Sequence, residues 1–108
     1  MPSTTGLRRS NDPPVLILMS LATGPKHGHA LIKDIELFAG VHLGAGALYG
    51  AITRLEERGL IEALRSDDRR RPYRITPAGT QALASAVEDM RKLAHLGASR
   101  LAPLWSAL

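Results

Sequence analysis

The sequence contains no cysteine. Disulfide bonds and thiolate metal sites are therefore excluded, and the composition fits a reducing compartment, so we expect a cytoplasmic protein. No apolar run approaches the roughly 18 residues that a membrane-spanning helix needs, and we expect no membrane partner.

Motifs of catalysis are missing as well. The chain has no phosphate-binding glycine loop, no sharp turn around a nucleophilic serine and no His-Glu-x-x-His zinc motif. Its serines, histidines and aspartates show no spacing that suggests a catalytic triad. We therefore expect a protein that is not an enzyme and that requires no cofactor.

What the chain does have is an excess of positive charge. It carries 14 lysines and arginines against 10 acidic residues, a formal net charge of +4, which favours polyanionic partners. With 108 residues, 44% hydrophobic and 22% charged, it is expected to form one globular domain. A chain of this length buries a modest core, so an additional interface would help to stabilise it.

The stretch from 45 to 76 carries the most specific pattern. Leu48, Ile52 and Leu55 recur at helical spacing and predict a helix over 45–58, which Gly59 ends. Apolar residues at 60–64 and 73–76 predict two strands, and the stretch 65–74, which includes the loop between them, contains five arginines and two aspartates. Helix, stop and hairpin with a cationic tip is the order of a winged helix-turn-helix, whose helix enters a major groove.

The residues before this stretch predict a tail and two further helices. Residues 1–11 are polar and are expected to be a flexible tail. Asp12-Pro13 indicates the start of a strongly apolar helix that ends at Thr23-Gly24-Pro25, and a second helix is predicted over 28–39, ended by Gly40. A helix as apolar as the first should be buried in the core or under a partner chain.

A long helix is predicted after Thr76-Pro77, and its apolar residues alternate by four and three. Such a heptad seam is typical of pairing with another helix. The alternative is that the seam covers its own domain, and Gly97 and Pro103 predict a kink or an end. We favour a homodimer, with Val15, Leu18, Leu83, Val87, Met90, Ala94, Leu101 and Leu104 as its contacts.

The predicted architecture is therefore mainly α-helical with a small β-hairpin. It divides into the tail 1–11, a winged helix-turn-helix over 12–76 and a C-terminal dimerisation helix over 77–108. Two recognition helices in a dimer would read a roughly palindromic operator of double-stranded DNA.

The candidate DNA contacts lie in the 45–58 helix and in the loop of the hairpin. Small residues early in this helix permit close approach either to DNA or to a packed helix, and the sequence leaves both open. Tyr49 is either a phosphate contact or a half-buried structural residue, while Arg54 could instead pair with Glu57, and Arg58 with Glu62. The candidates are Gly46, Ala47, Tyr49, Gly50, Thr53, Arg54, Arg69, Arg70 and Arg71.

Two other sites are weaker candidates. His27 and His29 flank Gly28 and could bind a metal ion with a carboxylate, although capping or packing is the favoured interpretation. Trp105, the single tryptophan, either walls an effector pocket between protomers or anchors the C-terminal end to the dimer.

Three motifs in this order resemble the PadR-like transcriptional regulators. They are L-x-x-G-P-x-H-G-H-x-L-I-K over 21–33, L-Y-G-A-I-T-R-L-E-E-R-G-L-I over 48–61 and R-R-P-Y-R-I-T-P-A-G over 70–79. The resemblance implies a dimeric DNA-binding repressor that is released by an effector, a small molecule or a metal ion, bound near the dimer interface. The alternative is a winged helix that serves as a protein-interaction or assembly module without specific DNA binding.

Overall fold

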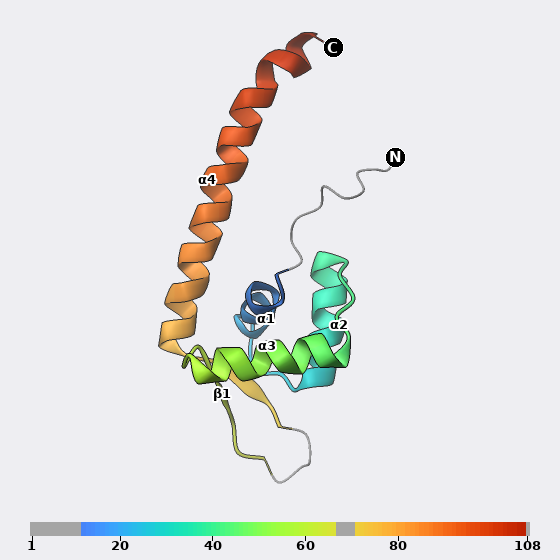
Figure 1. Ribbon diagram of the computed structural model, residues 1–108, viewed down its shortest axis with the longest axis vertical. Helices are drawn as coiled ribbons and strands as arrows, with labels where there is room; N and C mark the ends of the chain where they lie inside the picture. Colours follow the sequence, from blue (N-terminus) through green and yellow to red (C-terminus); the bar gives the residue numbers. More distant parts are fainter. Residues whose placement is uncertain (1–11, 67–70, 108) are drawn as a thin grey trace.

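The computed structural model describes residues 12–66 and 71–107. The expected tail over 1–11, together with Arg69 and Arg70 of the hairpin loop, lies outside the described residues. Within the described residues, four helices and a two-stranded antiparallel hairpin follow one another in the predicted order (Figure 1). Their bounds are α1 Pro13–Leu21, α2 Gly28–Ala39, α3 Ala45–Glu57, β1 Ile61–Ala63, β2 Tyr73–Ile75 and α4 Pro77–Ala107.

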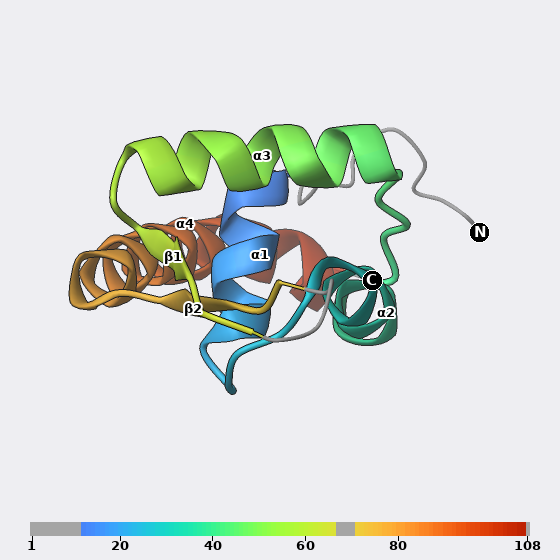
Figure 2. The same ribbon diagram turned by 90° about the horizontal axis from the view of Figure 1, so that it is seen from below.

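Helix α1 is the centre of the core. It packs against α2, α3, α4 and β2, and Figure 2 shows it in the middle of the body. Pro13 begins the helix as predicted, although the Asp12 side chain makes no capping hydrogen bond. Leu18, expected at a dimer interface, is only 4% exposed, because neighbours from the same chain already surround α1. In this conformation Leu18 cannot contribute contact surface to a partner.

The α2–α3 pair is built as the sequence predicts. Gly40 ends α2 with a φ of 67°, a conformation that favours glycine, and Leu43 in the short turn is buried. Gly44 is the extended residue before α3, and the stripe of α3 that includes Leu48 and Ile52 is buried against α1. The outward face of α3 is thereby fixed.

The hairpin is anchored on both sides of β2. Within it, Ile61 faces Ile75 and Ala63 faces Tyr73. On its other edge, Tyr73 exchanges two backbone hydrogen bonds with Lys26, in the α1–α2 connection, at 2.9 and 3.1 Å. Because a two-stranded hairpin is marginal by itself, this extra bridge matters for the position of the wing.

Helix α4 leaves the body and stands away from it (Figure 1). Its first turn is capped by Thr76, whose hydroxyl oxygen accepts from the Gly79 N–H at 3.1 Å and donates to the Gly59 carbonyl at 2.7 Å. The helix does not end at Gly97 or Pro103, and Figure 1 shows only a bend in its last turns. Proline inside a helix removes one backbone hydrogen bond, which accounts for a bend without an end. Among the described residues, no helix is both long and apolar enough to cross a membrane.

Gly79 is closely packed against backbone, the tightest such position among the glycines of the described residues. A Cβ atom there would lie 2.0 Å from the carbonyl oxygen of Leu60 and 2.8 Å from Cγ1 of Ile75. We expect Gly79→Ala to lower the free energy of unfolding by about 1–3 kcal/mol or more, because backbone must move to relieve the overlap. Urea denaturation of the free protein measures this change.

The matched control is Gly50→Ala inside α3. A Cβ at Gly50 meets only the flexible Arg54 side chain, at 3.7 Å, which is ordinary contact. Since alanine favours a helix interior over glycine by about 1 kcal/mol, this variant should be as stable as wild type or more stable. Equal stability of the Gly79 variant and wild type would contradict the packing described here.

Candidate nucleic-acid interface

The outward face of α3 collects the sequence-predicted contacts of this helix. They all lie opposite the stripe that is buried against the core, and all are exposed except Gly50, which is half-buried. The residues are Gly46, Ala47, Tyr49, Gly50, Thr53 and Arg54. The structure thus brings them together on one surface.

The small residues in the first turn of α3 have no helix packed against them. A Cβ at Gly44 or at Gly46 would meet nothing within 4 Å. Packing between helices, one of the two explanations left open by the sequence, therefore does not account for these glycines. The backbone of this turn is open to a partner from outside.

Tyr49 joins α3 to the start of α2. Its side chain is 48% exposed, and a Cβ at Gly28 would overlap its hydroxyl group, so the ring lies across the first turn of α2. The N-terminus of a helix carries partial positive charge and N–H groups without intrahelical partners. The hydroxyl of Tyr49 therefore lies at a place suited to an anion, and the residue has a packing role as well.

The polar residues that follow Tyr49 in α3 differ in whether their side chains already form hydrogen bonds or ion pairs within the chain. The hydroxyl of Thr53 donates to the carbonyl of Tyr49 at 2.9 Å, so its proton is used within the helix. Among the described residues, Arg54 forms no ion pair. The suggested pairing of Arg58 with Glu62 is wrong, because Glu62 lies opposite Arg74 in the hairpin and accepts from its Nε at 2.8 Å.

The described part of the wing places positive charge beside α3. Arg65 and Arg71 are exposed at the two ends of its loop. Burial raises the pKa of the Tyr73 phenol above its ordinary value, Glu56 and Tyr49 of α3 add to the shift, and Arg71 lowers it. The Tyr73 phenol therefore lies within electrostatic range of Glu56 and Tyr49 of α3 and of Arg71 in the wing.

The histidine pair has a structural use. Nδ1 of His27 accepts from the N–H of Ala30 at 3.3 Å and caps α2, which confirms the capping interpretation for this residue. The rings of His27 and His29 are stacked, with centroids 6.5 Å apart. Among the described residues, no group of three histidines or carboxylates could hold a metal ion.

The expected dimer contacts on α4 are mostly exposed in one chain. Val87, Leu101 and Leu104 each expose at least 41% of their surface, whereas Leu83 packs partly against the core and Met90 is half-buried. Ala94 is exposed as well. Outside this seam, Leu93 and Leu96 are exposed on α4, and Leu37 and Phe38 are exposed on α2. The sequence interpretation did not predict the exposure of these four side chains.

A groove of about 280 Å³ lies between α1 and α4. Its walls are mainly apolar, and two carboxylates are among the lining residues, which are Asp12, Val15, Leu16, Met19, Ala86, Asp89 and Met90. Trp105, the predicted pocket residue, lies near the far end of α4, is 58% exposed and does not line this groove. Within one chain, the tryptophan and the groove are therefore separate features.

Comparison with known proteins identifies the family. Over 85 residues the chain is 44% identical to an uncharacterised 37.1 kDa protein in transposon Tn4556 of Streptomyces fradiae, covering 79% of this chain and 25% of that protein. The chain thus spans a quarter of the length of this curated relative.

Solved structures show the same fold. A transcriptional regulator of Clostridium thermocellum superposes with a TM-score of 0.71 at 28% identity, over 77% of this chain and 86% of that one. A PadR family transcription regulator of Clostridium difficile gives a TM-score of 0.75 at 22% identity, over 82% of this chain and 97% of that one. Residues 17–85 match the family described as transcriptional regulator PadR-like. The chain therefore belongs to the PadR-like family of transcriptional regulators.

Proposed function

We propose that this chain binds double-stranded DNA with sequence specificity and regulates transcription as a homodimer. The observation that carries the proposal is the outward face of α3, whose first turn is open around Gly46, together with the exposed Arg65 and Arg71 at the two ends of the wing loop. Such a surface fits a major groove with the wing on the flanking backbone or minor groove. Membership in the PadR-like family supports the same conclusion.

Each part of the surface has a distinct role in this proposal. The first turn of α3 brings backbone close to the DNA, Tyr49 places its hydroxyl near a phosphate, and Arg54 has no ion pair among the described residues that would compete with a base edge. The arginines of the wing, including Arg69 and Arg70 outside the described residues, supply phosphate contacts without sequence preference.

The dimer is supported by the exposed apolar side chains of α4. A lone protomer would expose Val87, Leu101 and Leu104, which follow the heptad spacing along one face of α4, and an exposed apolar face of this kind favours a partner helix. A two-fold axis would relate two α3 helices, so the operator should be roughly palindromic. Because such a regulator acts on chromosomal DNA, we place it in the cytoplasm.

We infer a repressor that an effector releases. The groove between α1 and α4 adjoins the proposed dimer contacts Val15 and Met90, so a small molecule bound there would change the angle between protomers. Trp105 could contact such an effector only if it came from the partner's α4, since it does not line the groove of its own chain. The operator, selected from random duplex fragments, is the reagent that all DNA tests below require.

Gly46→Ala is the sharpest test of α3 as the recognition helix. In the free protein a methyl group at this open position should raise the free energy of unfolding by about 0.5–1 kcal/mol. The same methyl group should lower operator affinity by about tenfold, which corresponds to about 1.4 kcal/mol. Denaturation and fluorescence-anisotropy titration measure the two effects. A stabilised variant that keeps full affinity would show that DNA does not approach this turn.

Removal of Arg69, Arg70 and Arg71 together tests the wing. Their replacement by alanine should weaken binding to all duplexes and reduce the slope of log affinity against log salt by about one for each phosphate that is no longer neutralised. The control is Lys92→Ala on α4, which also removes an exposed positive charge. If the triple variant keeps the wild-type slope, the wing does not touch DNA and a protein-interaction role becomes the better explanation.

Substitution of Val87 and Leu101 by aspartate tests the dimer. Both side chains are exposed in one chain, so a monomer should tolerate the change, whereas a dimer would bury the charges at a cost of roughly several kcal/mol. We expect sedimentation at micromolar concentration to show dissociation, with loss of operator binding. The control variant carries aspartate at Ser85 and Ser99, exposed on the opposite face of α4. A wild-type monomer, or a Val87/Leu101 variant that stays dimeric, would refute the proposal.

A further inference from the structure

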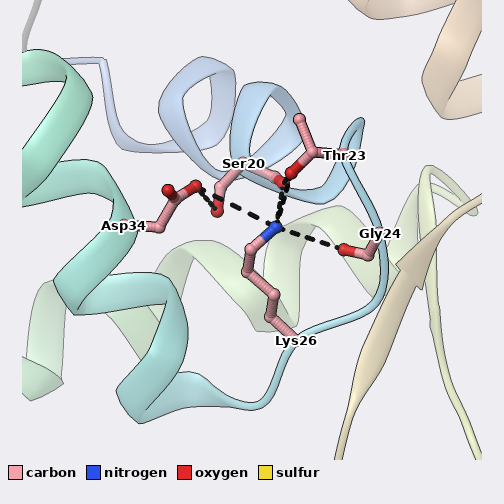
Figure 3. Close-up of polar contacts among 5 residues, drawn as sticks. All are labelled: Ser20, Thr23, Gly24, Lys26 and Asp34. Atoms are coloured by element: carbon pink, nitrogen blue, oxygen red, sulfur yellow. Dashed lines mark hydrogen bonds and ion pairs between the residues drawn. The ribbon is translucent and has the colours of Figure 1, made fainter.

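The ammonium group of Lys26 lies within the bend between α1 and α2 (Figure 3). It donates to the carbonyl oxygens of Ser20 and Gly24 and to the hydroxyl of Thr23, the last two at 3.3 and 2.8 Å. The side chain is 19% exposed. An ammonium group has three donors, and here the three have acceptors from the end of α1 and the turn that follows it.

A carboxylate from α2 completes this cluster. Oδ2 of Asp34 accepts the hydroxyl of Ser20 at 2.6 Å and lies 3.9 Å from the Lys26 Nζ atom (Figure 3). Ser20 is 1% exposed, so its hydroxyl needs this partner. Because a largely buried charge is costly unless it is bonded and paired, the cluster favours one geometry of α1, the turn and α2.

The backbone of the same residue holds the wing. The Lys26 N–H donates to the Tyr73 carbonyl and the Lys26 carbonyl accepts from the Tyr73 N–H. Tyr73 is the first residue of β2, directly after the loop that carries Arg71, and Pro72 before it accepts from the Leu64 N–H at 2.8 Å. The side chain of Lys26 is therefore fixed to the bend, and its backbone to the base of the wing.

We propose that Lys26 is the positioning residue of the wing. Its ammonium group holds the segment at 24–26 in place. The backbone bridge to Tyr73 then fixes the hairpin, and with it Arg71, relative to this segment. The two strands of the hairpin have three residues each, so their pairing alone constrains the wing weakly. The consequence for DNA affinity rests on the proposed function, whereas the constraint on the free protein does not.

Amide hydrogen exchange on the free protein tests the constraint. Lys26→Met keeps most of the length of the side chain and removes its donors. We expect the amide of Tyr73 to exchange about tenfold faster relative to the amide of Ile52 in α3, because the wing opens locally while the core stays closed. Lys33→Met, which removes an exposed lysine from α2, should leave this ratio unchanged. Equal acceleration at both amides, or no acceleration, would overturn the proposal.

A double-mutant cycle with Arg71→Ala tests the consequence for DNA. In the wild-type background, Arg71→Ala should weaken operator binding severalfold. In the Lys26→Met background the same substitution should have little further effect, because the wing no longer holds Arg71 in position for DNA. A merely structural role for Lys26 would give additive losses, and additive losses would overturn the positioning role. If neither variant alters DNA affinity while the exchange ratio changes, the positioning role of Lys26 in DNA binding is overturned and only the constraint on the free protein stands. If the wild-type protein binds no operator, the proposed function fails, whereas the exchange result is unaffected.

Thr23→Val provides a milder variant should Lys26→Met not fold. It removes one acceptor of the ammonium group and leaves the charge pair with Asp34 in place. The exchange ratio of Tyr73 to Ile52 should rise in the same direction by a smaller factor. An unchanged ratio in this variant would also count against the proposal.

Discussion

The nine residues of α1 carry no charged side chain, and such a helix must be covered on most of its sides. The cover comes from α2, α3, β2 and the beginning of α4, all within one chain. This arrangement sets the rest of the molecule. With its buried stripe on α1, α3 can only present its opposite face outward, and the hairpin and α4 leave the body from fixed positions on the same core.

Three consecutive residues in the α1–α2 connection tie the functional parts together. Lys26 bridges to Tyr73 at the base of the wing, His27 caps α2, and Gly28 lies beneath the hydroxyl of Tyr49 on α3. The wing, the first helix and the second helix of the winged helix-turn-helix thus share one short segment. A change in this segment would therefore affect all three elements.

Helix α4 differs from the other helices in what its apolar residues contact. At 31 residues it is roughly 46 Å long, and from 91 to 107 its residues are exposed in one chain. An apolar seam that the chain itself does not cover fits a second copy better than it fits water. The groove beside α1 lies next to this seam, so the dimerisation and the effector binding proposed above would be coupled.

Local signals in the sequence are enough to predict the helices, the hairpin and their order. These signals are Pro13 and Pro77 at helix starts, Thr76 as a cap, and Gly40 and Gly59 at positive φ after helix ends. The outward face of α3 followed from the spacing of its buried residues. Each of these features depends on neighbours within a few positions, so periodicity and turn chemistry suffice to predict it.

Which side chains meet across the chain depended instead on the packing of whole elements. In the folded chain Leu18 lies in the core and not at a dimer interface, and Glu62 pairs with Arg74 and not with Arg58. No helix packs against Gly46, so close helix packing does not explain this glycine. The fold also brought Lys26 into contact with α1, the turn, α2 and β2. Such pairings arise between elements that are distant in sequence, and no local pattern encodes their geometry.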